Sequence, residues 1–356
     1  MGVERTGDRA GASLLVGEPL DVEGYPQALP ELDLEQVHVY VRHGERTPVR
    51  TRMADPPASI PEHWQMCSVA RRFSEAVNST TTTLGEPHPD GMWFKRGTEM
   101  RDGRTVANLC IYAFLGTLES LLNDLQSTYN FGVALRRLYV DKLGFLPRTL
   151  QNENQVYFRS TNVSRTIESL EHIVHGLYPQ THCATGVIPS ILVRNRVDEN
   201  IVSNILSCPL LGLLELRFAE AAAARWNSRL QTLDGRLSKY LNGRPIRVDG
   251  SPRASGILDT VRSAAAHGIK VPDEFRDPEV IDLIVCPKLS IKTEKGRRLG
   301  MGRLLADVST RMQTKIEQGD KDPLKVLVFT THDSTLAALC STFDAFDEKY
   351  GHFPPI

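Results

Sequence analysis

Three residues that could hold and attack a phosphate group lie close together in the sequence: Arg42, His43 and Arg46. They follow directly after the apolar run 37–41. An unprotonated imidazole can attack phosphorus and form a phosphohistidine, which water later cleaves. Guanidinium groups hold phosphate oxygens bidentately and keep their charge at any working pH. We therefore predict that His43 is a catalytic nucleophile and that Arg42 and Arg46 bind the phosphate.

Two further β-rich runs, 155–158 and 325–331, also end in cationic or titratable side chains. The first run is followed by Arg159, and the second by His332 and Asp333. In a loose phosphoryl-transfer transition state the charge lies on the peripheral oxygens, so cations around them promote the reaction. We predict that Arg159 and a protonated His332 bind phosphate. Asp333 would protonate the leaving alkoxide and then deprotonate the attacking water.

The position of these residues at the ends of β-rich runs indicates the fold. Open α/β sheets bind ligands where parallel strands end, so we predict an α/β fold with a mainly parallel sheet flanked by helices. A helix is expected from Asn162 to His175. Arg165 lies near its beginning, and the sequence leaves open whether this arginine binds phosphate or only caps or pairs with the helix.

The chain is expected to consist of a discontinuous core and an inserted cap. Residues 1–33 read as an N-terminal tail, and residues 34–194 and 320–356 as the α/β core. Residues 215–245 and 255–268 are rich in Ala, Leu and Arg, and we predict that residues 195–319 form a mainly helical cap. The apolar stretch 106–122 predicts a buried or groove-lining helix.

The composition argues against several classes of partner. The 42 Lys and Arg residues balance 43 Asp and Glu without a block of like charge, so nucleic acid or an anionic membrane is not an expected partner. The six cysteines are scattered without a CxxC pair, and we predict no metal or other cofactor. No stretch reaches the roughly 20 clean apolar residues of a membrane span. Because no apolar signal core follows the N-terminus, we expect a cytoplasmic or mitochondrial protein.

Three motifs of the chain together resemble those of a known family. These motifs are Arg42-His43-Gly44-x-Arg46-x-Pro48, the segment 159–166, and the pair His332-Asp333. In order and spacing they are similar to the motifs of the histidine acid phosphatases, the second branch of the histidine phosphatase superfamily. The stretches 131–147 and 253–259 look most like the lysophosphatidic acid phosphatase type and its fungal relatives.

The resemblance implies a phosphoglycerate-mutase-like fold and gives the matching residues the same roles. His43 would be phosphorylated and Asp333 would donate the proton, and the phosphate would be bound by Arg42, Arg46, Arg159 and His332. The expected function is a metal-independent acid phosphatase that hydrolyses phosphate monoesters, with lysophosphatidic acid as the expected substrate. The alternatives are a phytase-like inositol-phosphate phosphatase and a non-catalytic isoform that only binds phosphate esters. The oligomeric state is left open.

The chain departs from the family pattern in two places. Between Gly103 and Ser127 the family usually has a Gly-x-Leu-Thr segment, whereas this chain has a locally different sequence that begins at Val106. The family also adds a further strand beyond Asp333, where this chain ends after 23 more residues. The C-terminal strand is therefore expected to be missing, which would leave an open sheet edge.

Overall fold

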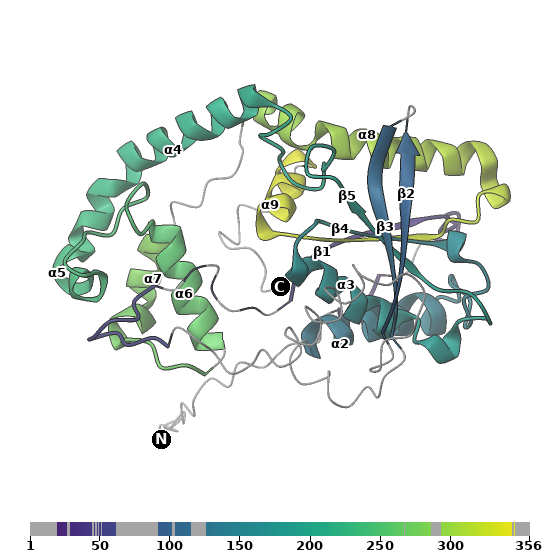
Figure 1. Cartoon of the computed structure of the whole chain (residues 1–356), viewed down its shortest axis with the longest axis horizontal. Helices are drawn as coiled ribbons and strands as arrows, with labels where there is room; N and C mark the ends of the chain where they lie inside the picture. The colour runs from purple at the N-terminus through teal and green to yellow at the C-terminus, as the bar shows by residue number, and fades with distance from the viewer. Residues whose placement is uncertain are drawn as a thin grey trace, which may run out of the picture.

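A computed structural model gives the fold of the chain (Figure 1). The structure describes residues 20–26, 29–44, 46, 48, 50, 52–61, 92–101, 104–114, 126–266, 268–285, 293–343 and 345. For residues 92–101, 104–114 and 126 it describes the backbone alone. The expectation of a missing C-terminal strand lies mostly outside these residues and stays a prediction.

A six-stranded sheet forms the centre of the core, in the order β1-β6-β4-β5-β3-β2. The four parallel strands are β1 (Val37–Arg42), β6 (Val326–Thr331), β4 (Val156–Ser160) and β5 (Ser190–Arg194). In the register, Arg42 lies beside Thr331 and Ser160 beside Thr330. The three strands that carry the sequence motifs therefore end at the same edge, which confirms the predicted mainly parallel α/β sheet.

The helix predicted over the stretch 106–122 is not found. Its first part lies in β3 (Arg104–Phe114), which pairs antiparallel with β2 (Met92–Arg101) and with β5; the part after Phe114 lies outside the described residues. The two strands are separated in sequence by Asp102-Gly103, a pair strongly favoured in two-residue hairpin connections. A short apolar run fits a buried helix and a strand equally well, and this turn signal was the one that distinguished them.

Helices cover both faces of the sheet (Figure 1). One face packs against α2 (Gln126–Arg136), its π-helical continuation Arg137–Lys142, and α3 (Ser164–Leu177). The apolar residues Ile167, Leu170, Ile173 and Leu177 recur at helical spacing and place α3 on the sheet. A side chain at Gly176 would overlap with the backbone of α2, so these two helices approach closely.

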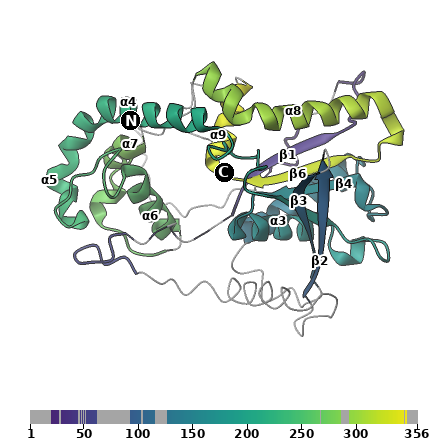
Figure 2. The same cartoon turned by 45° about the horizontal axis from the view of Figure 1, so that its top comes forward.

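The other face of the sheet packs against α8 (Glu294–Gln318) and α9 (Asp333–Thr342), as Figure 2 shows. Met301, Leu304 and Val308 follow one side of α8 and bury against α9 and Tyr40 of β1. The apolar side of α8 thus packs on the core, although its residues fall within the range 195–319 predicted as the cap; the division of the chain into core and cap stays a prediction.

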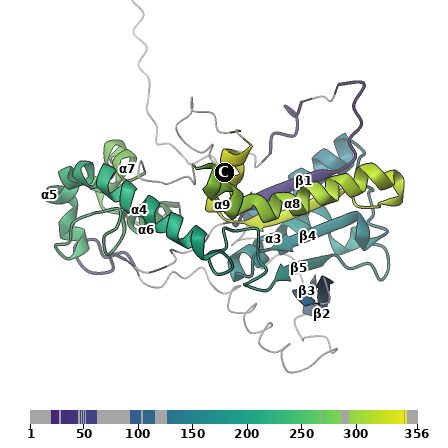
Figure 3. The same ribbon diagram turned by 90° about the horizontal axis from the view of Figure 1, so that it is seen from above.

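The cap has a hydrophobic centre of its own, and α4 (Pro209–Leu230) connects it to the core (Figure 3). It contains α5 (Asp234–Leu237), α6 (Ala254–Ala266) and α7 (Pro278–Val285). Met53 and Ile60, from the segment after β1, are buried in the same cluster. Short 3-10 turns lie at Glu153–Gln155, Gln180–His182, Gln231–Leu233, Ser238–Leu241, Asp273–Arg276 and Gly319–Lys321. None of the described helices is both long and apolar enough to cross a bilayer.

Candidate active site

The two motif histidines meet where β1 and β6 end. The backbone N–H of His43 donates to the carbonyl of Thr331 at 3.0 Å, which continues the β1–β6 ladder by one residue. His332 follows Thr331 directly, and the two imidazole rings lie with their centroids 5.5 Å apart at an angle of 66°. The backbone N–H of Gly44 donates to Ser169 Oγ at 2.9 Å, which fastens the turn after His43 to α3.

Hydrogen bonding determines which nitrogen of His43 carries the proton. Nδ1 lies 2.8 Å from the carbonyl oxygen of Gly44, which can only accept, so Nδ1 must be protonated. In the neutral ring the Nε2 lone pair is then available for attack on an electrophile. Arg46 Nε donates toward this lone pair at 3.4 Å. His43 is only 3 % exposed, so its ring is almost fully covered by protein.

The surroundings of His43 keep it neutral at acid pH. Burial lowers the pKa of His43 to about 3, and the positive charges of Arg42, Arg165 and Arg46 act in the same direction, against the hydrogen bond to Gly44. An imidazole with this pKa is unprotonated, and hence nucleophilic, through most of the acid range.

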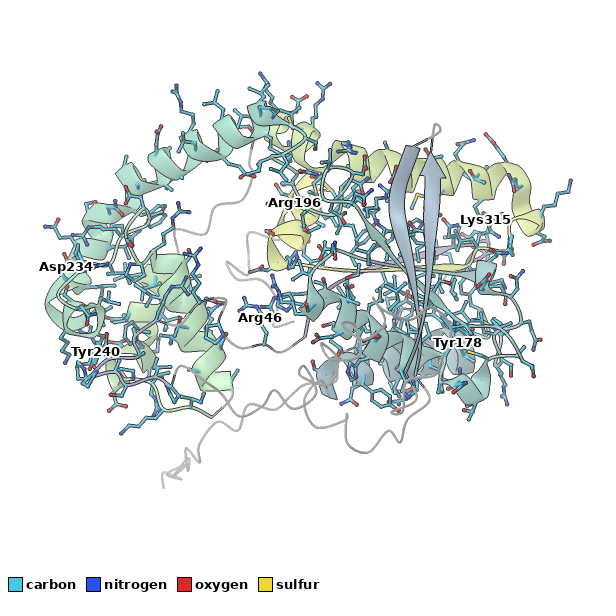
Figure 4. All side chains as sticks on the ribbon, in the orientation of Figure 1. Arg46, Tyr178, Arg196, Asp234, Tyr240 and Lys315 are labelled. Atoms are coloured by element: carbon cyan, nitrogen blue, oxygen red, sulfur yellow. The ribbon has the colours of Figure 1, made fainter. Side chains whose placement is uncertain are left out.

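Three arginines surround the histidine pair. The pKa of Arg165 is lowered by burial and by the nearby charges of Arg46 and Arg42, so the three like charges lie close to one another. Arg165 Nη2 lies 3.3 Å from His332 Nδ1, and Arg165 Nε is buried without a hydrogen-bond partner. Arg46 Nη2 forms an ion pair with Asp259 Oδ1 of α6 at 2.8 Å. Figure 4 places Arg46 between the sheet core and the cap. Such a group of cations favours a bound anion.

His332 is also neutral in this arrangement. Arg165 can only donate, so His332 Nδ1 accepts its hydrogen bond, and Nε2–H points to Thr161 Oγ1 at 3.2 Å. Burial lowers the pKa of His332 to about 4, with the charge of Arg165 adding to the shift and that of Asp333 opposing it. Asp333 is exposed at the first position of α9, and its charge also acts on Arg165. The structure thus brings Arg42, His43, Arg46, His332 and Asp333 into one site.

Arg159, in contrast, is drawn into a separate buried cluster. Its guanidinium Nη2 donates to Glu199 Oε1 and Asn200 Oδ1, both at 2.6 Å, and its Nη1 lies 3.9 Å from Asp307 of α8. Its side chain is 1 % exposed. The prediction that Arg159 binds phosphate is therefore not supported by its position, which is that of a structural ion pair.

The alternation of side chains along β4 explains why Arg159 and Arg165 lie in different places. Phe158 faces the core cluster shared with α3, so the next residue, Arg159, must face the side of α8. Arg165 lies near the strand ends because α3 begins at Ser164, shortly after β4 ends at Ser160. The signal in the sequence was its place in the first turn of a helix that follows a strand, where anions are commonly bound.

No group of three His, Cys, Asp or Glu side chains in the described part of the chain is arranged to hold a metal ion.

A neutral histidine among arginines, at the carboxyl edge of a mainly parallel sheet, is typical of a protein that binds phosphate groups and transfers them through a histidine. Comparison with known proteins is more specific: the chain belongs to the histidine phosphatase superfamily (branch 2), whose profile matches residues 125–353. This region contains His332 and Asp333, whereas His43 precedes it.

Among curated relatives, a probable acid phosphatase of Schizosaccharomyces pombe is 33 % identical over 92 % of this chain and 74 % of its own length. Human testicular acid phosphatase is 26 % identical over 93 % of this chain and 67 % of its own length. Human lysophosphatidic acid phosphatase type 6 is 24 % identical, with 90 % and 72 % covered. The structure of Hafnia alvei phytase superposes with a TM-score of 0.53 at 16 % identity, covering 89 % of this chain and 77 % of that one. This last likeness shows the shared fold.

Proposed function

We propose that the chain is an acid phosphatase that hydrolyses phosphate monoesters through a phosphohistidine on His43. The observation that carries this proposal is the geometry around His43: its Nδ1 is hydrogen-bonded to the Gly44 carbonyl, which leaves the Nε2 lone pair for attack, and Arg46 Nε lies 3.4 Å from Nε2. The family and its acid phosphatase relatives support the same activity.

In the first step His43 Nε2 attacks phosphorus while the bond from phosphorus to the ester oxygen breaks. Asp333, protonated at the start, gives its proton to the departing alkoxide. In the second step water attacks the phosphohistidine, its proton passes to the Asp333 carboxylate, and His43 is released with inorganic phosphate. Asp333 suits this role because it is exposed beside the histidine pair, where a leaving group and water can both reach it.

The phosphate oxygens would be held by Arg42, Arg46 and Arg165. We propose Arg165 in place of Arg159, because Arg165 lies against His332 and within the field of the other two arginines. A bound phosphate dianion would favour protonation of His332, which would then add another donor.

For the substrate we propose lysophosphatidic acid, supported by the likeness to the human lysophosphatidic acid phosphatase. Parallel assays on lysophosphatidic acid and inositol hexakisphosphate, at equal concentration and acid pH, separate this substrate from the inositol-phosphate alternative. A higher kcat/KM on the inositol phosphate would reject the lipid assignment and leave the phosphatase assignment intact.

A rapid-quench experiment, in which the protein is labelled with radioactive phosphate, tests the mechanism. The protein is mixed with a phosphate ester carrying radioactive phosphorus and quenched within milliseconds under conditions that preserve phosphohistidine. We expect label on the wild-type protein, none on His43→Ala, and normal label on the matched control His182→Ala, whose imidazole lies on the exposed turn Gln180–His182. A wild-type protein that binds phosphate but never becomes labelled would support the non-catalytic alternative.

The variant Asp333→Asn tests the proton donor separately. With p-nitrophenyl phosphate, whose leaving group needs little protonation, label should form readily but be lost slowly, because the general base for water is missing. With an alkyl phosphate the label itself should form slowly. Equal slowing on both esters would argue against Asp333 as the proton donor.

A further inference from the structure

The cap contains a basic pocket apart from the histidine pair. A cavity of about 840 Å³ lies between the segment that follows β1 and the first turn of α6. Four arginines line it, Arg50, Arg52, Arg244 and Arg253, together with a single carboxylate, Asp55. Four positive charges and one negative charge leave a formal excess of three positive charges on the wall.

The four guanidinium groups have no carboxylate partner among the described residues. Arg52 Nη1 donates to the carbonyl of Arg50 at 3.1 Å, and Arg244 Nη1 to the carbonyl of Ser251 at 3.2 Å. The Asp55 carboxylate accepts from the amide of Asn242 at 3.2 Å rather than from an arginine. The charge of the pocket is therefore not cancelled by any of these contacts.

Three other cations of the cap, by contrast, are paired with carboxylates. Arg247 meets Asp234 with two hydrogen bonds of 2.8 and 2.7 Å. Arg236 pairs with Asp277, and Lys239 with Glu274, each at 2.7 Å. These three cations outside the pocket thus have acidic partners, whereas the four arginines that line it have none among the described residues. This distribution is what an external anion would complete.

The backbone of α6 contributes to the same wall. Arg253 is the residue before the first turn of α6, and Ser255 and Gly256 line the pocket. A Cβ at Gly256 would come within 2.7 Å of the guanidinium atoms of Arg52, so the glycine lets this side chain lie directly over the helix. The positive end of the 13-residue helix and the Arg52 charge therefore act on the same space.

We infer that this pocket is a second anion-binding site, which takes a small molecule that carries several phosphate groups. Its volume lies in the range of small-molecule sites and is large for a single phosphate. An excess of three positive charges matches a ligand with several negative charges. The inference does not depend on His43 being catalytic, because none of the lining residues belongs to the histidine site.

The test is calorimetric titration with tripolyphosphate. All proteins carry His43→Ala, which prevents turnover of the probe if His43 is the nucleophile. The pocket variant adds Arg244→Ser and Arg253→Ser, and Ser at position 253 should preserve the beginning of α6 because serine is a favoured residue before a helix. The matched control adds Arg217→Ser and Arg262→Ser, which remove two exposed arginines of α4 and α6 outside the pocket.

We expect the pocket variant to bind tripolyphosphate at least about tenfold more weakly than its parent, since each lost charged hydrogen bond weakens binding about tenfold. The control should stay within about twofold. Equal loss in both variants would show that only net charge matters, and unchanged binding in the pocket variant would place the probe elsewhere; either result overturns the inference. If Arg165→Ser abolishes binding while the pocket variant still binds, the probe occupies the histidine site, and the inference is overturned.

The variant Gly256→Ala separates geometry from charge. It keeps all four arginines and displaces only the flexible end of Arg52, so the fold should persist, and we expect binding several-fold weaker than in the parent. Binding equal to the parent would contradict the proposed arrangement. On a small monoester, the pocket variant made with His43 intact should retain the kcat of the wild type, so failure of this inference and failure of the proposed phosphatase activity give different results.

Discussion

Exchanging Arg159 or Arg165 for methionine separates a structural arginine from a phosphate-binding one. The side chain of Arg159 is 1 % exposed and that of its partner Glu199 is 8 % exposed. Removing one partner of a buried ion pair costs about 3–5 kcal/mol, because the remaining charge is left without compensation. Glu199 Oε1 keeps two backbone donors, the N–H groups of Asn200 and Ile201 at 2.8 and 2.7 Å. We therefore expect Arg159→Met to lower the free energy of unfolding by about 3 kcal/mol, at the lower end of that range.

Arg165→Met should behave in the opposite way. Arg165 lies among the like charges of Arg42 and Arg46, so its loss relieves repulsion, and the free energy of unfolding should stay the same or rise slightly. Its loss should lower kcat by about 10²–10³-fold, the usual effect of removing one group that stabilises transition-state charge.

Urea denaturation followed by circular dichroism, and turnover of a chromogenic phosphate ester, measure the two effects. Arg196→Met, at an exposed arginine, is the control and should change neither quantity. Adding Glu199→Gln to Arg159→Met should recover part of the lost stability, because the two residues are coupled. The reasoning is refuted if Arg159→Met unfolds like the wild type and loses activity, while Arg165→Met remains fully active.

Three further results are expected. The fold lowers the pKa of His43 to about 3, so below about pH 6.5 the unfolded chain binds a proton that the folded chain does not. The free energy of unfolding should therefore fall as the pH drops through this window. Urea denaturation at pH 4 and 7 should show a smaller fall for His43→Ala than for the wild type. Asp259→Asn removes a partly exposed ion pair that orients Arg46, and kcat/KM for a small ester should drop about fivefold, the effect of about 1 kcal/mol. An unchanged kcat/KM would show that Arg46 keeps its orientation without Asp259. Gly176→Ala forces a methyl group into the backbone of α2 and should cost about 1–3 kcal/mol of unfolding free energy, whereas the control Gly302→Ala in α8, where a Cβ would meet nothing within 4 Å, should not lower it.

The sequence was sufficient to place His43 and His332 because their positions follow from local patterns. Each follows directly after a β-rich run, and parallel strands in register bring such ends together, as the pairing of Arg42 with Thr331 shows. No knowledge of contacts between distant segments was needed for this prediction. The position of Arg159 away from the histidine pair could not be predicted in this way, because it depends on which face of β4 is covered by α3 and which by α8.

The strand β3 was missed for another reason. Apolar content does not distinguish a helix from a strand in a run of this length, and the antiparallel partners that decide it, β2 and β5, lie on either side in the sequence. The packing of α8 was not predictable for a similar reason: α8 is joined in sequence to the cap helices, but its apolar side packs against α9. Both placements depend on contacts that hydrophobic periodicity does not identify, and for β3 the Asp102-Gly103 pair was the one local signal that favoured a strand.

The burial of Met53 and Ile60 within the cap means that the two halves of the molecule are not independent modules. Met53 and Ile60, which follow the nucleophile in the sequence, contribute to the hydrophobic centre of the cap, and Asp259 of α6 forms an ion pair with Arg46. Exchanging the cap for that of a relative would therefore succeed only if residues 46–61 were transplanted with it. Any rocking of the cap would be transmitted to the arginine nearest the attacking nitrogen.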